Sequence, residues 1–257
     1  MKLLYKIFRL ILLVGHLLSG LVLTFIAFSP LWRSTHFPNR VVIWWSRTLC
    51  QCLHLQIRCY GDIATPPCLL VANHITWLDV FVLLRLSPIT FVSKHEISSW
   101  PIIGWLARRV GTLFVRRGFD VMSVVTEEMA TVLTNGAYVA LFPEGTTTDG
   151  TAVKRFHARM FQAAITANVT VQPIALRYPR GTGVSKIVPY VGDDTFLSNT
   201  WRLVGETAIP VEIWFCPLIN ANGKTRRELA DYAQMHITQV LTQSKADIQD
   251  LGNPKNE

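Results

Sequence analysis

The pattern of apolar and polar positions divides the chain near residue 60. Leu10–Ser29 contains no Lys, Arg, Asp or Glu, and as a helix this segment spans about 30 Å, the thickness of a bilayer's hydrocarbon core. Asn39–Leu55 places apolar side chains among a few polar ones, which predicts a second helix packed on, or lying in, the membrane interface. Residues 1–60 are therefore predicted to form membrane-associated helices.

The first apolar segment also has the layout of a cleaved signal peptide, with a basic start and an apolar middle. Its apolar run is longer than such a peptide needs, and Pro30–Trp32 offers no small-residue cleavage site. We therefore predict that the segment is retained. Basic residues flank it on both sides, so the positive-inside rule does not orient it. A spanning helix and a re-entrant pair of helices both fit.

Beyond residue 60, short apolar runs alternate with helical stretches, which predicts one α/β domain over residues 61–245 and a polar tail over 246–257. The strands expected are Leu55–Cys59, Cys68–Ala72, Thr90–Ser93, Thr112–Arg116, Ala137–Phe142, Val169–Leu176, Ile187–Val191 and Val211–Phe215. The helices expected are Trp77–Leu86, Pro101–Val110, Asp120–Thr134, Lys154–Ala167 and Thr225–Thr242.

Charge supports this division of the chain. The net charge is +8, yet the first acidic residue is Asp62, and all seven charged residues before it are Lys or Arg. The remaining 18 cations and 17 acids nearly balance. A basic arm can bind nucleic acid, but here apolar runs and tryptophans separate the cations, which fits a bilayer interface better. We therefore expect a membrane partner and no nucleic acid.

Composition narrows the class of protein further. Charged residues are 16% of the chain, against about 25% in ordinary soluble domains, which disfavours a freely soluble enzyme. The five cysteines are odd in number and lack zinc-ligand spacing. They fit apolar fillers in a reducing compartment, so we expect the α/β domain on the cytoplasmic side of the membrane.

Candidate chemistry begins at Asn73–Asp79, directly after an apolar strand, where α/β proteins build their sites. On one helix, His74 and Asp79 would lie about 140° apart and could not meet. We therefore predict that His74 lies in the loop, with Thr76 as helix N-cap. Asp79 then falls in the first turn, where its carboxylate orients the imidazole as a general base. The same spacing also fits a plain cap, in which Asp79 only accepts backbone N–H groups.

Three further sequence blocks are candidates for the site. Two of them lie at the ends of predicted strands, and the third is itself a predicted strand. Phe142–Gly150 offers Glu144 for a substrate hydroxyl, and N–H groups and hydroxyls for an oxyanion or phosphate; an ordinary Pro-Gly turn is the alternative. Gly111–Arg117 ends in an arginine that could pair with an anion or be solvated. Val171–Leu176 is a core strand that contains a proline. Serine-hydrolase, zinc-helix, P-loop and dinucleotide motifs are absent from the sequence.

In this order, the four blocks resemble the motifs of the glycerophospholipid acyltransferase family, which includes the bacterial 1-acylglycerol-3-phosphate acyltransferases. The matching residues are His74 and Asp79, then Gly111, Phe114 and Arg117, then Phe142 to Thr146, and finally Pro173. The resemblance covers residues 68–176. It implies a mixed sheet flanked by helices, with His74 as the base and Asp79 as its orienting partner. The residues expected to bind substrate are Asn73, Arg117, Glu144, Gly145, Thr146 and Thr147.

The resemblance also implies a reaction. An acceptor hydroxyl attacks an acyl thioester directly, without a covalent enzyme intermediate and without a metal or redox cofactor. Acyl carrier protein and acyl-CoA are both possible donors. The acceptor is a lysolipid in the bilayer and the thioester donor arrives from the cytosol, so the enzyme is expected on the cytoplasmic side of the inner membrane.

The acceptor expected is 1-acylglycerol-3-phosphate, the substrate of the commonest class. Two departures favour another subgroup: Thr147 stands where those enzymes usually carry arginine, and Phe156 and His157 stand in place of a Phe-Lys pair. Both resemble the lyso-ornithine lipid acyltransferases, whose acceptor bears a 3-hydroxyacyl group and no phosphate. A membrane lipid-binding protein without catalysis is the second alternative.

Overall fold

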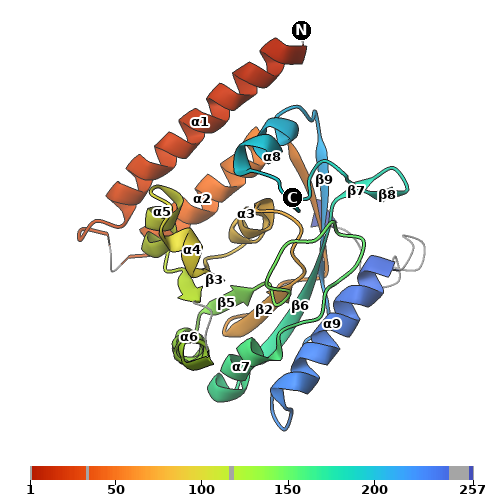
Figure 1. Cartoon of the computed structure of the whole chain (residues 1–257). Helices are drawn as coiled ribbons and strands as arrows, with labels where there is room; N and C mark the ends of the chain where they lie inside the picture. The colour runs from red at the N-terminus through yellow and green to blue at the C-terminus, as the bar shows by residue number, and fades with distance from the viewer. Residues whose placement is uncertain (1, 33–34, 116–118, 243–254, 257) are drawn as a thin grey trace.

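The computed structural model describes residues 2–32, 35–115, 119–242 and 255–256. Its main sheet has the order β10-β1-β9-β6-β2-β5-β3-β4 (Figure 1). The strands are β1 (Leu55–Tyr60), β2 (Cys68–Ala72), β3 (Ile89–Lys94), β4 (Leu113–Val115), β5 (Tyr138–Leu141), β6 (Thr170–Arg177), β9 (Ile209–Phe215) and β10 (Lys255–Asn256). A hairpin of β7 (Pro179–Arg180) and β8 (Gly183–Val184) stands apart.

Strand directions make the sheet mixed, as predicted. From β6 through β2, β5 and β3 to β4 every pair is parallel, whereas β9 runs antiparallel to β6. The carboxyl ends of the five parallel strands therefore meet at one edge of the sheet. The segments that follow these strands are the ones that carry the candidate site.

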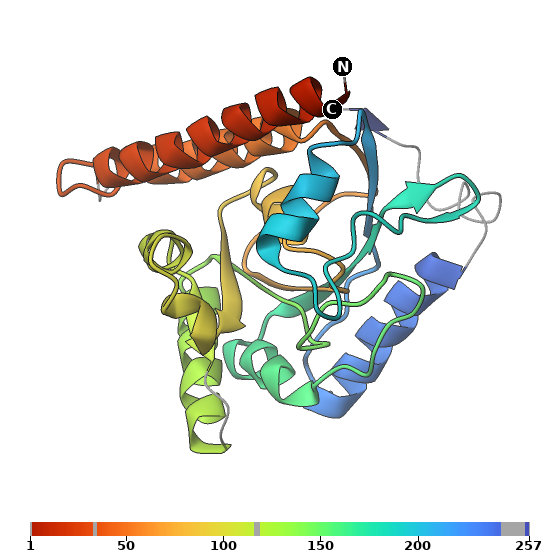
Figure 2. The ribbon, with the colours of Figure 1, turned by 45° about the horizontal axis from the view of Figure 1, so that its top comes forward.

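Helices cover both faces of the sheet (Figures 1 and 2). They are α1 (Lys2–Ala27), α2 (Phe37–Cys52), α3 (Leu78–Leu84), α4 (His95–Ser98), α5 (Ile103–Arg109), α6 (Phe119–Thr134), the 3₁₀ turn η1 (Ala158–Phe161), α7 (Gln162–Ala167), α8 (Phe196–Leu203) and α9 (Arg226–Thr242). The alternation of β2 separates two cores: Leu69 and Val71 pack with α6, α7 and α9, while Leu70 and Ala72 pack with α2, α3 and α8.

Helix α1 lies against α2 along one side of the domain (Figure 2). It is long and apolar enough to cross a membrane, by length and composition. Its buried residues, at helical spacing, are Arg9, Leu13, His16, Gly20, Thr24 and Ala27. Its opposite face exposes Leu4, Ile11, Leu18, Val22 and Phe25, with Leu4 and Phe25 73% and 74% exposed. The helix is thus two-sided in its packing, with one face on the domain and an exposed face that is rich in apolar side chains.

A buried arginine fastens α1 to the domain. Arg9 is 4% exposed, and its guanidinium donates to the backbone carbonyls of Cys52 and Val204, each at 2.9 Å, and to that of Glu206. These carbonyls lie at the carboxyl ends of α2 and α8, where helices leave carbonyls unsatisfied and favour a cation. His16 and Trp45 stack at 4.5 Å further along the pair of helices.

Two expected elements differ from the structure. Ile187–Val191 is a loop, because side chains satisfy its backbone instead of a strand: the Ser185 hydroxyl accepts two of its N–H groups, and Asn199 donates to the carbonyls of Val188 and Pro189. The helix expected from Lys154 starts only at η1. The N–H groups of residues 154, 156 and 157 bond instead to Glu144, Gln234 and Pro143.

Several elements were not expected from the sequence. They are α4, α8 and the β7–β8 hairpin. Helix α8 is started by a capping box in which Thr195 and Ser198 bond each other's backbone N–H groups. Of the polar tail predicted over 246–257, Lys255–Asn256 pairs with β1, and the remainder lies outside the described residues.

Candidate active site

Three neighbouring parallel strands deliver the candidate site. His74 follows β2, Glu144 follows β5, and Tyr178 follows β6, in the strand order β6-β2-β5. Because parallel strands end at the same edge, residues about 70 and 100 positions apart in the chain meet there. The sheet therefore brings together three loops that carry candidate polar side chains.

His74 lies in the loop, as predicted, and its ring is held on two sides. Its Nδ1 is 2.8 Å from Oδ2 of Asp79, and its ring stacks on Phe142 at 3.9 Å. The side chain is 19% exposed. Within the described residues, no hydrogen bond reaches the other ring nitrogen, Nε2. A neutral imidazole held in this way presents Nε2 as a base toward an incoming hydroxyl.

Asp79 is fully buried, and four donors saturate its carboxylate. Oδ2 accepts from the N–H groups of Ile75 and Thr76, at 2.7 and 3.0 Å, as well as from His74. Oδ1 accepts the hydroxyl of Tyr178 at 2.7 Å. The carboxylate therefore combines both roles that the sequence left open: it caps the loop backbone and it orients the imidazole.

The predicted N-cap at Thr76 is wrong. Helix α3 begins at Leu78 with Trp77 as its N-cap and without a side-chain cap hydrogen bond. Among the described residues, the buried hydroxyl of Thr76 has no hydrogen-bond partner. The side chain of Asp79 reaches back to the N–H groups of Ile75 and Thr76, so it holds the loop before the helix, and the helix itself starts without a side-chain cap.

Glu144 connects the loop after β2 to the segment around Lys154 through their backbone N–H groups. The residue is 4% exposed, and its two carboxylate oxygens accept the N–H groups of His74 and Lys154, both at 2.8 Å. Burial raises the pKa of Glu144, and these two hydrogen bonds oppose the rise. The geometry makes Glu144 a brace for the His74 backbone.

The side-chain amide of Asn73 is likewise hydrogen-bonded to the backbone. Its amide donates to the carbonyl of Leu176 at 3.0 Å and accepts the N–H of the same residue at 2.8 Å. This pair continues the β2–β6 ladder by one side chain. Asn73 thereby fixes where the His74 loop leaves the sheet.

The loop after β5 wraps over His74. Gly145 has φ +67°, and a Cβ there would lie 3.3 Å from the ring of His157, so glycine is suited to this turn. Thr148 donates its N–H to the His74 carbonyl at 2.8 Å, and the Thr147 hydroxyl donates to the Tyr190 carbonyl. Thr146 is exposed beside them. Arg117, which follows β4, lies outside the described residues.

The cysteines are not arranged as reactive groups. The five cysteines are free thiols, and burial raises the pKa of Cys216 to about 12, which keeps that thiol protonated and unreactive. Within the described residues, no group of three or more His, Cys, Asp or Glu side chains is placed to hold a metal ion. The chemistry that the described residues support is proton abstraction by His74.

Comparison with known proteins shows the family of this chain. A family model described as acyltransferase matches residues 56–177. The lyso-ornithine lipid O-acyltransferase of Pseudomonas aeruginosa is 38% identical over 84% of this chain and 83% of its own length. This chain belongs to the acyltransferase family. The resemblance drawn from the four sequence blocks is thereby confirmed.

A further relative and a solved structure are also similar to this acyltransferase. The 1-acyl-sn-glycerol-3-phosphate acyltransferase of Neisseria gonorrhoeae is 33% identical over 70% of this chain and 71% of its own length. The crystal structure of the 1-acyl-sn-glycerophosphate acyltransferase PlsC of Thermotoga maritima matches the fold with a TM-score of 0.69 at 17% identity. That match covers 95% of this chain and all of the other, so the predicted fold is confirmed.

Sequence reasoning missed Tyr178 and the bracing role of Thr148. Tyr178 is 1% exposed and directly follows β6. The strand expected over Val169–Leu176 ended two residues short of it, so its position at the carboxyl edge was overlooked. A polar residue immediately after a parallel strand was the signal that would have found it.

Proposed function

We propose that this acyltransferase moves a fatty acyl group from a thioester donor to the hydroxyl of a lysolipid. The observation that carries the proposal is the pair of His74 and Asp79, with Nδ1 oriented at 2.8 Å and Nε2 left to an acceptor. An imidazole oriented on one nitrogen by a saturated carboxylate is suited to act as a general base.

In the proposed reaction, Nε2 of His74 removes the proton of the acceptor hydroxyl as its oxygen attacks the thioester carbonyl. A C–O bond forms, and the carbonyl carbon becomes tetrahedral and carries an oxyanion. The carbonyl then re-forms as the C–S bond breaks, and the departing thiolate takes the proton from the imidazolium. Ester and free thiol are the products, and His74 returns to its neutral form. The acyl group is never bonded to the protein.

The other predicted residues fall into two groups. Some position the His74 loop, and the others are assigned to contact the substrate. Glu144 and Asn73 hold the His74 loop through the backbone hydrogen bonds already described, so we assign them a positioning role. Thr146 and Thr147 donate their backbone N–H groups to none of the described residues, and with Gly145 they form the turn over the site. We assign these two N–H groups to the oxyanion or acceptor. Arg117, which follows β4 in the sequence, is assigned to an anionic substrate group.

For the acceptor, we propose the lyso-ornithine lipid ahead of 1-acylglycerol-3-phosphate. The relative that acts on lyso-ornithine lipid is more similar and is matched over more of both chains. Thr147 also supports this choice, because its hydroxyl is bound to the Tyr190 carbonyl, and it offers no positive charge for a phosphate. The donor is a thioester of acyl carrier protein or CoA, both of which are acidic and suit Arg108 and Arg109 at the end of α5.

We further propose that α1 and α2 attach the acyltransferase to the cytoplasmic face of the inner membrane without crossing it. One face of α1 is packed on the domain and the other exposes leucine, isoleucine, valine and phenylalanine side chains. Arg9 would be expensive to place in hydrocarbon, and it is buried within the protein instead. Helices of this kind lie along a membrane with their apolar face inserted.

The first experiment offers both lysolipids and a thioester donor to membranes that contain the protein. We expect turnover of the lyso-ornithine lipid, and a loss of about 10² to 10⁴ in rate for His74→Ala. His236→Ala, on α9, serves as the matched control and should keep full activity. Thermal unfolding of each variant shows whether it is folded.

The possible results distinguish the proposed mechanism, the choice of acceptor and the non-catalytic alternative. Equal rates for His74→Ala and the wild type would overturn the proposed mechanism. Turnover of 1-acylglycerol-3-phosphate alone would overturn the acceptor while keeping the mechanism. Binding of lysolipid without turnover of either acceptor would favour a non-catalytic lipid-binding protein.

A further inference from the structure

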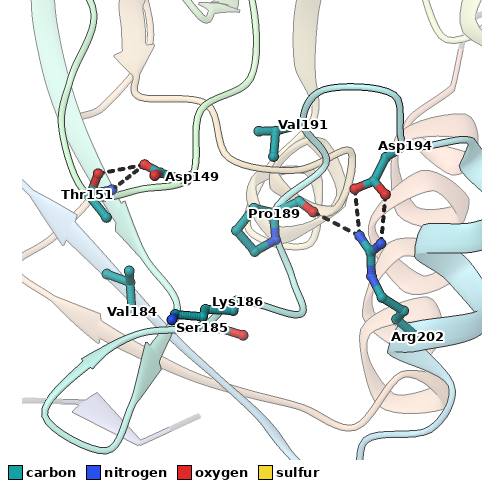
Figure 3. Close-up of a pocket in the computed structure, with 9 residues that line it drawn as sticks. All are labelled: Asp149, Thr151, Val184, Ser185, Lys186, Pro189, Val191, Asp194 and Arg202. Atoms are coloured by element: carbon teal, nitrogen blue, oxygen red, sulfur yellow. Dashed lines mark hydrogen bonds and ion pairs between the residues drawn. The ribbon is translucent and has the colours of Figure 1, made fainter.

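A cavity of about 380 Å³ lies beside the candidate active site. Figure 3 shows that its lining residues come from the loop after β5, from β8 and the segment between β8 and α8, and from the last turn of α8. Charged side chains of both signs line it. They are Asp149, Lys186, Asp194 and Arg202.

Two of these charges form a closed pair. Arg202 binds Asp194 through two hydrogen bonds of 2.6 Å and also donates to the Pro189 carbonyl. This bidentate contact is the strong geometry for arginine and carboxylate, and it holds the pKa of Asp194 below its usual value. The pair is therefore a fixed wall of the cavity.

The other two charges are not held in a closed ion pair, although the charge of Lys154 also acts on Asp149. None of the ion pairs between described residues includes Asp149 or Lys186. One oxygen of Asp149 accepts the N–H and the hydroxyl of Thr151, at 2.9 and 2.7 Å. These bonds lower the pKa of Asp149, so the carboxylate is ionised at neutral pH. Lys186 is exposed in the segment that follows β8.

Backbone hydrogen bonds fix the cavity next to His74. Thr148, which precedes Asp149, donates its N–H to the His74 carbonyl at 2.8 Å. Tyr190, between the lining residues Pro189 and Val191, donates to the Ile75 carbonyl at 2.9 Å. With a step of about 3.8 Å between consecutive Cα atoms, Asp149 lies within roughly 10 Å of the His74 backbone. A ligand group in the cavity is thus close to the base.

We propose that this cavity binds the headgroup of the acceptor, and that this headgroup is a zwitterion with one carboxylate and one ammonium. The carboxylate pairs with Lys186 and the ammonium pairs with Asp149. An ornithine headgroup has this chemistry. The inference rests on the proposed function, because it assigns a subsite for the acceptor of that reaction.

Charge complementarity favours a zwitterion over a phosphate. A phosphate monoester carries nearly two negative charges near neutral pH, and in this cavity it would face the carboxylates of Asp149 and Asp194. Like charges placed across a binding site oppose binding and so exclude the wrong ligand. A headgroup of zero net charge meets a cavity in which the four charges cancel. In a lyso-ornithine lipid, the acceptor hydroxyl is on the hydroxyacyl chain, only a few bonds from the headgroup. A headgroup bound in this cavity therefore leaves the hydroxyl close to His74.

The test measures KM and kcat for lyso-ornithine lipid with the full-length protein in membranes. We expect Lys186→Ala and Asp149→Asn each to raise KM about tenfold, the effect of losing one charge-assisted contact, with kcat within about twofold. Lys186→Arg keeps the charge and should stay near the wild-type KM. Lys224→Ala, in the turn before α9, is the matched control. Unchanged KM in both cavity variants would overturn the proposal.

A binding measurement separates this inference from the proposed function. Labelled lyso-ornithine lipid is titrated onto detergent-solubilised wild type, Lys186→Ala and Lys224→Ala, where no turnover is needed. Weaker binding by Lys186→Ala alone supports the cavity even if the wild type proves inactive on this lipid. Equal binding by all three proteins overturns it even if the wild type is active. Since Lys186 is exposed, its variants are expected to fold.

Discussion

At the scale of single residues, one carboxylate organises the site. Asp79 accepts four hydrogen bonds, from the proposed base His74, from the hydroxyl of Tyr178 and from two backbone N–H groups. Because it is fully buried, losing any donor leaves part of its charge unsatisfied, which is costly in a low dielectric. The imidazole is therefore held by a network and not by a single contact.

Tyr178→Phe tests this network. The change removes the hydroxyl that donates to Oδ1 and leaves the ring volume in place. We expect kcat to fall about tenfold, with KM for the acceptor unchanged, and stability to fall by about 1 to 2 kcal/mol. Steady-state kinetics and thermal unfolding measure the two effects.

Tyr60→Phe is the matched control for this change. Tyr60 is half-buried and stacks on Trp214 at 3.7 Å, away from Asp79. Its variant should keep wild-type kcat. If Tyr178→Phe lost stability but kept full kcat, Tyr178 would be a structural residue without a positioning role.

At the scale of elements, α1 is a docked helix. An apolar helix of 26 residues is typical of a membrane span, yet every third or fourth residue on one face is packed against the domain. The deciding residue is Arg9, which caps the carboxyl ends of two other helices through their carbonyls. The element is therefore defined by its neighbours as much as by its own hydropathy.

Arg9→Ala should loosen this docking. The change leaves the carbonyls of Cys52, Val204 and Glu206 without their donor, and we expect a loss on the order of 2 to 3 kcal/mol in unfolding free energy. For a chain of this size that is roughly 4 to 10 °C in Tm. Differential scanning fluorimetry in detergent measures it. Arg40→Ala, an exposed position on α2, is the control, and equal Tm values for the two variants would refute the anchoring role.

At the scale of the whole molecule, the exposed face of α1 and the site edge give the acyltransferase its working orientation. Helices α1 and α2 cover one side of the sheet, while α6, α7 and α9 cover the other (Figure 1). In the membrane attachment that we propose for α1, a lysolipid would enter on the side of α2, α3 and α8. The donor thioester can then arrive from water.

Removing the exposed apolar face should release the protein from membranes. We expect Leu4, Ile11, Leu18 and Phe25, all replaced by Ser, to weaken vesicle binding more than about a hundredfold, because each buried side chain contributes about 1.5 to 3 kcal/mol. Flotation with lipid vesicles measures this. The control replaces Leu218, Tyr232 and Met235, exposed at α9 and the segment before it. Wild-type flotation of the α1 variant would show that another part of the chain holds the membrane.

Local pattern alone determined much of this protein. The apolar N-terminal segment, the strands β1 to β6 and β9, and the placement of His74 in a loop before Asp79 all follow from short-range periodicity and turn chemistry. The order of the four blocks determined the family. These features depend on residues a few positions apart, which the sequence displays directly.

Tertiary structure alone decided the rest. Tyr178 reaches Asp79 across 99 positions and Glu144 reaches His74 across 70, and such contacts exist only because β6, β2 and β5 are neighbours in the sheet. The loop at Ile187–Val191 shows the same dependence, since Ser185, Asn199 and Ile75 satisfy backbone groups that a local pattern assigns to a strand. Strand order and distant side-chain partners carry no local periodicity, so the fold has to bring them together before they can be seen.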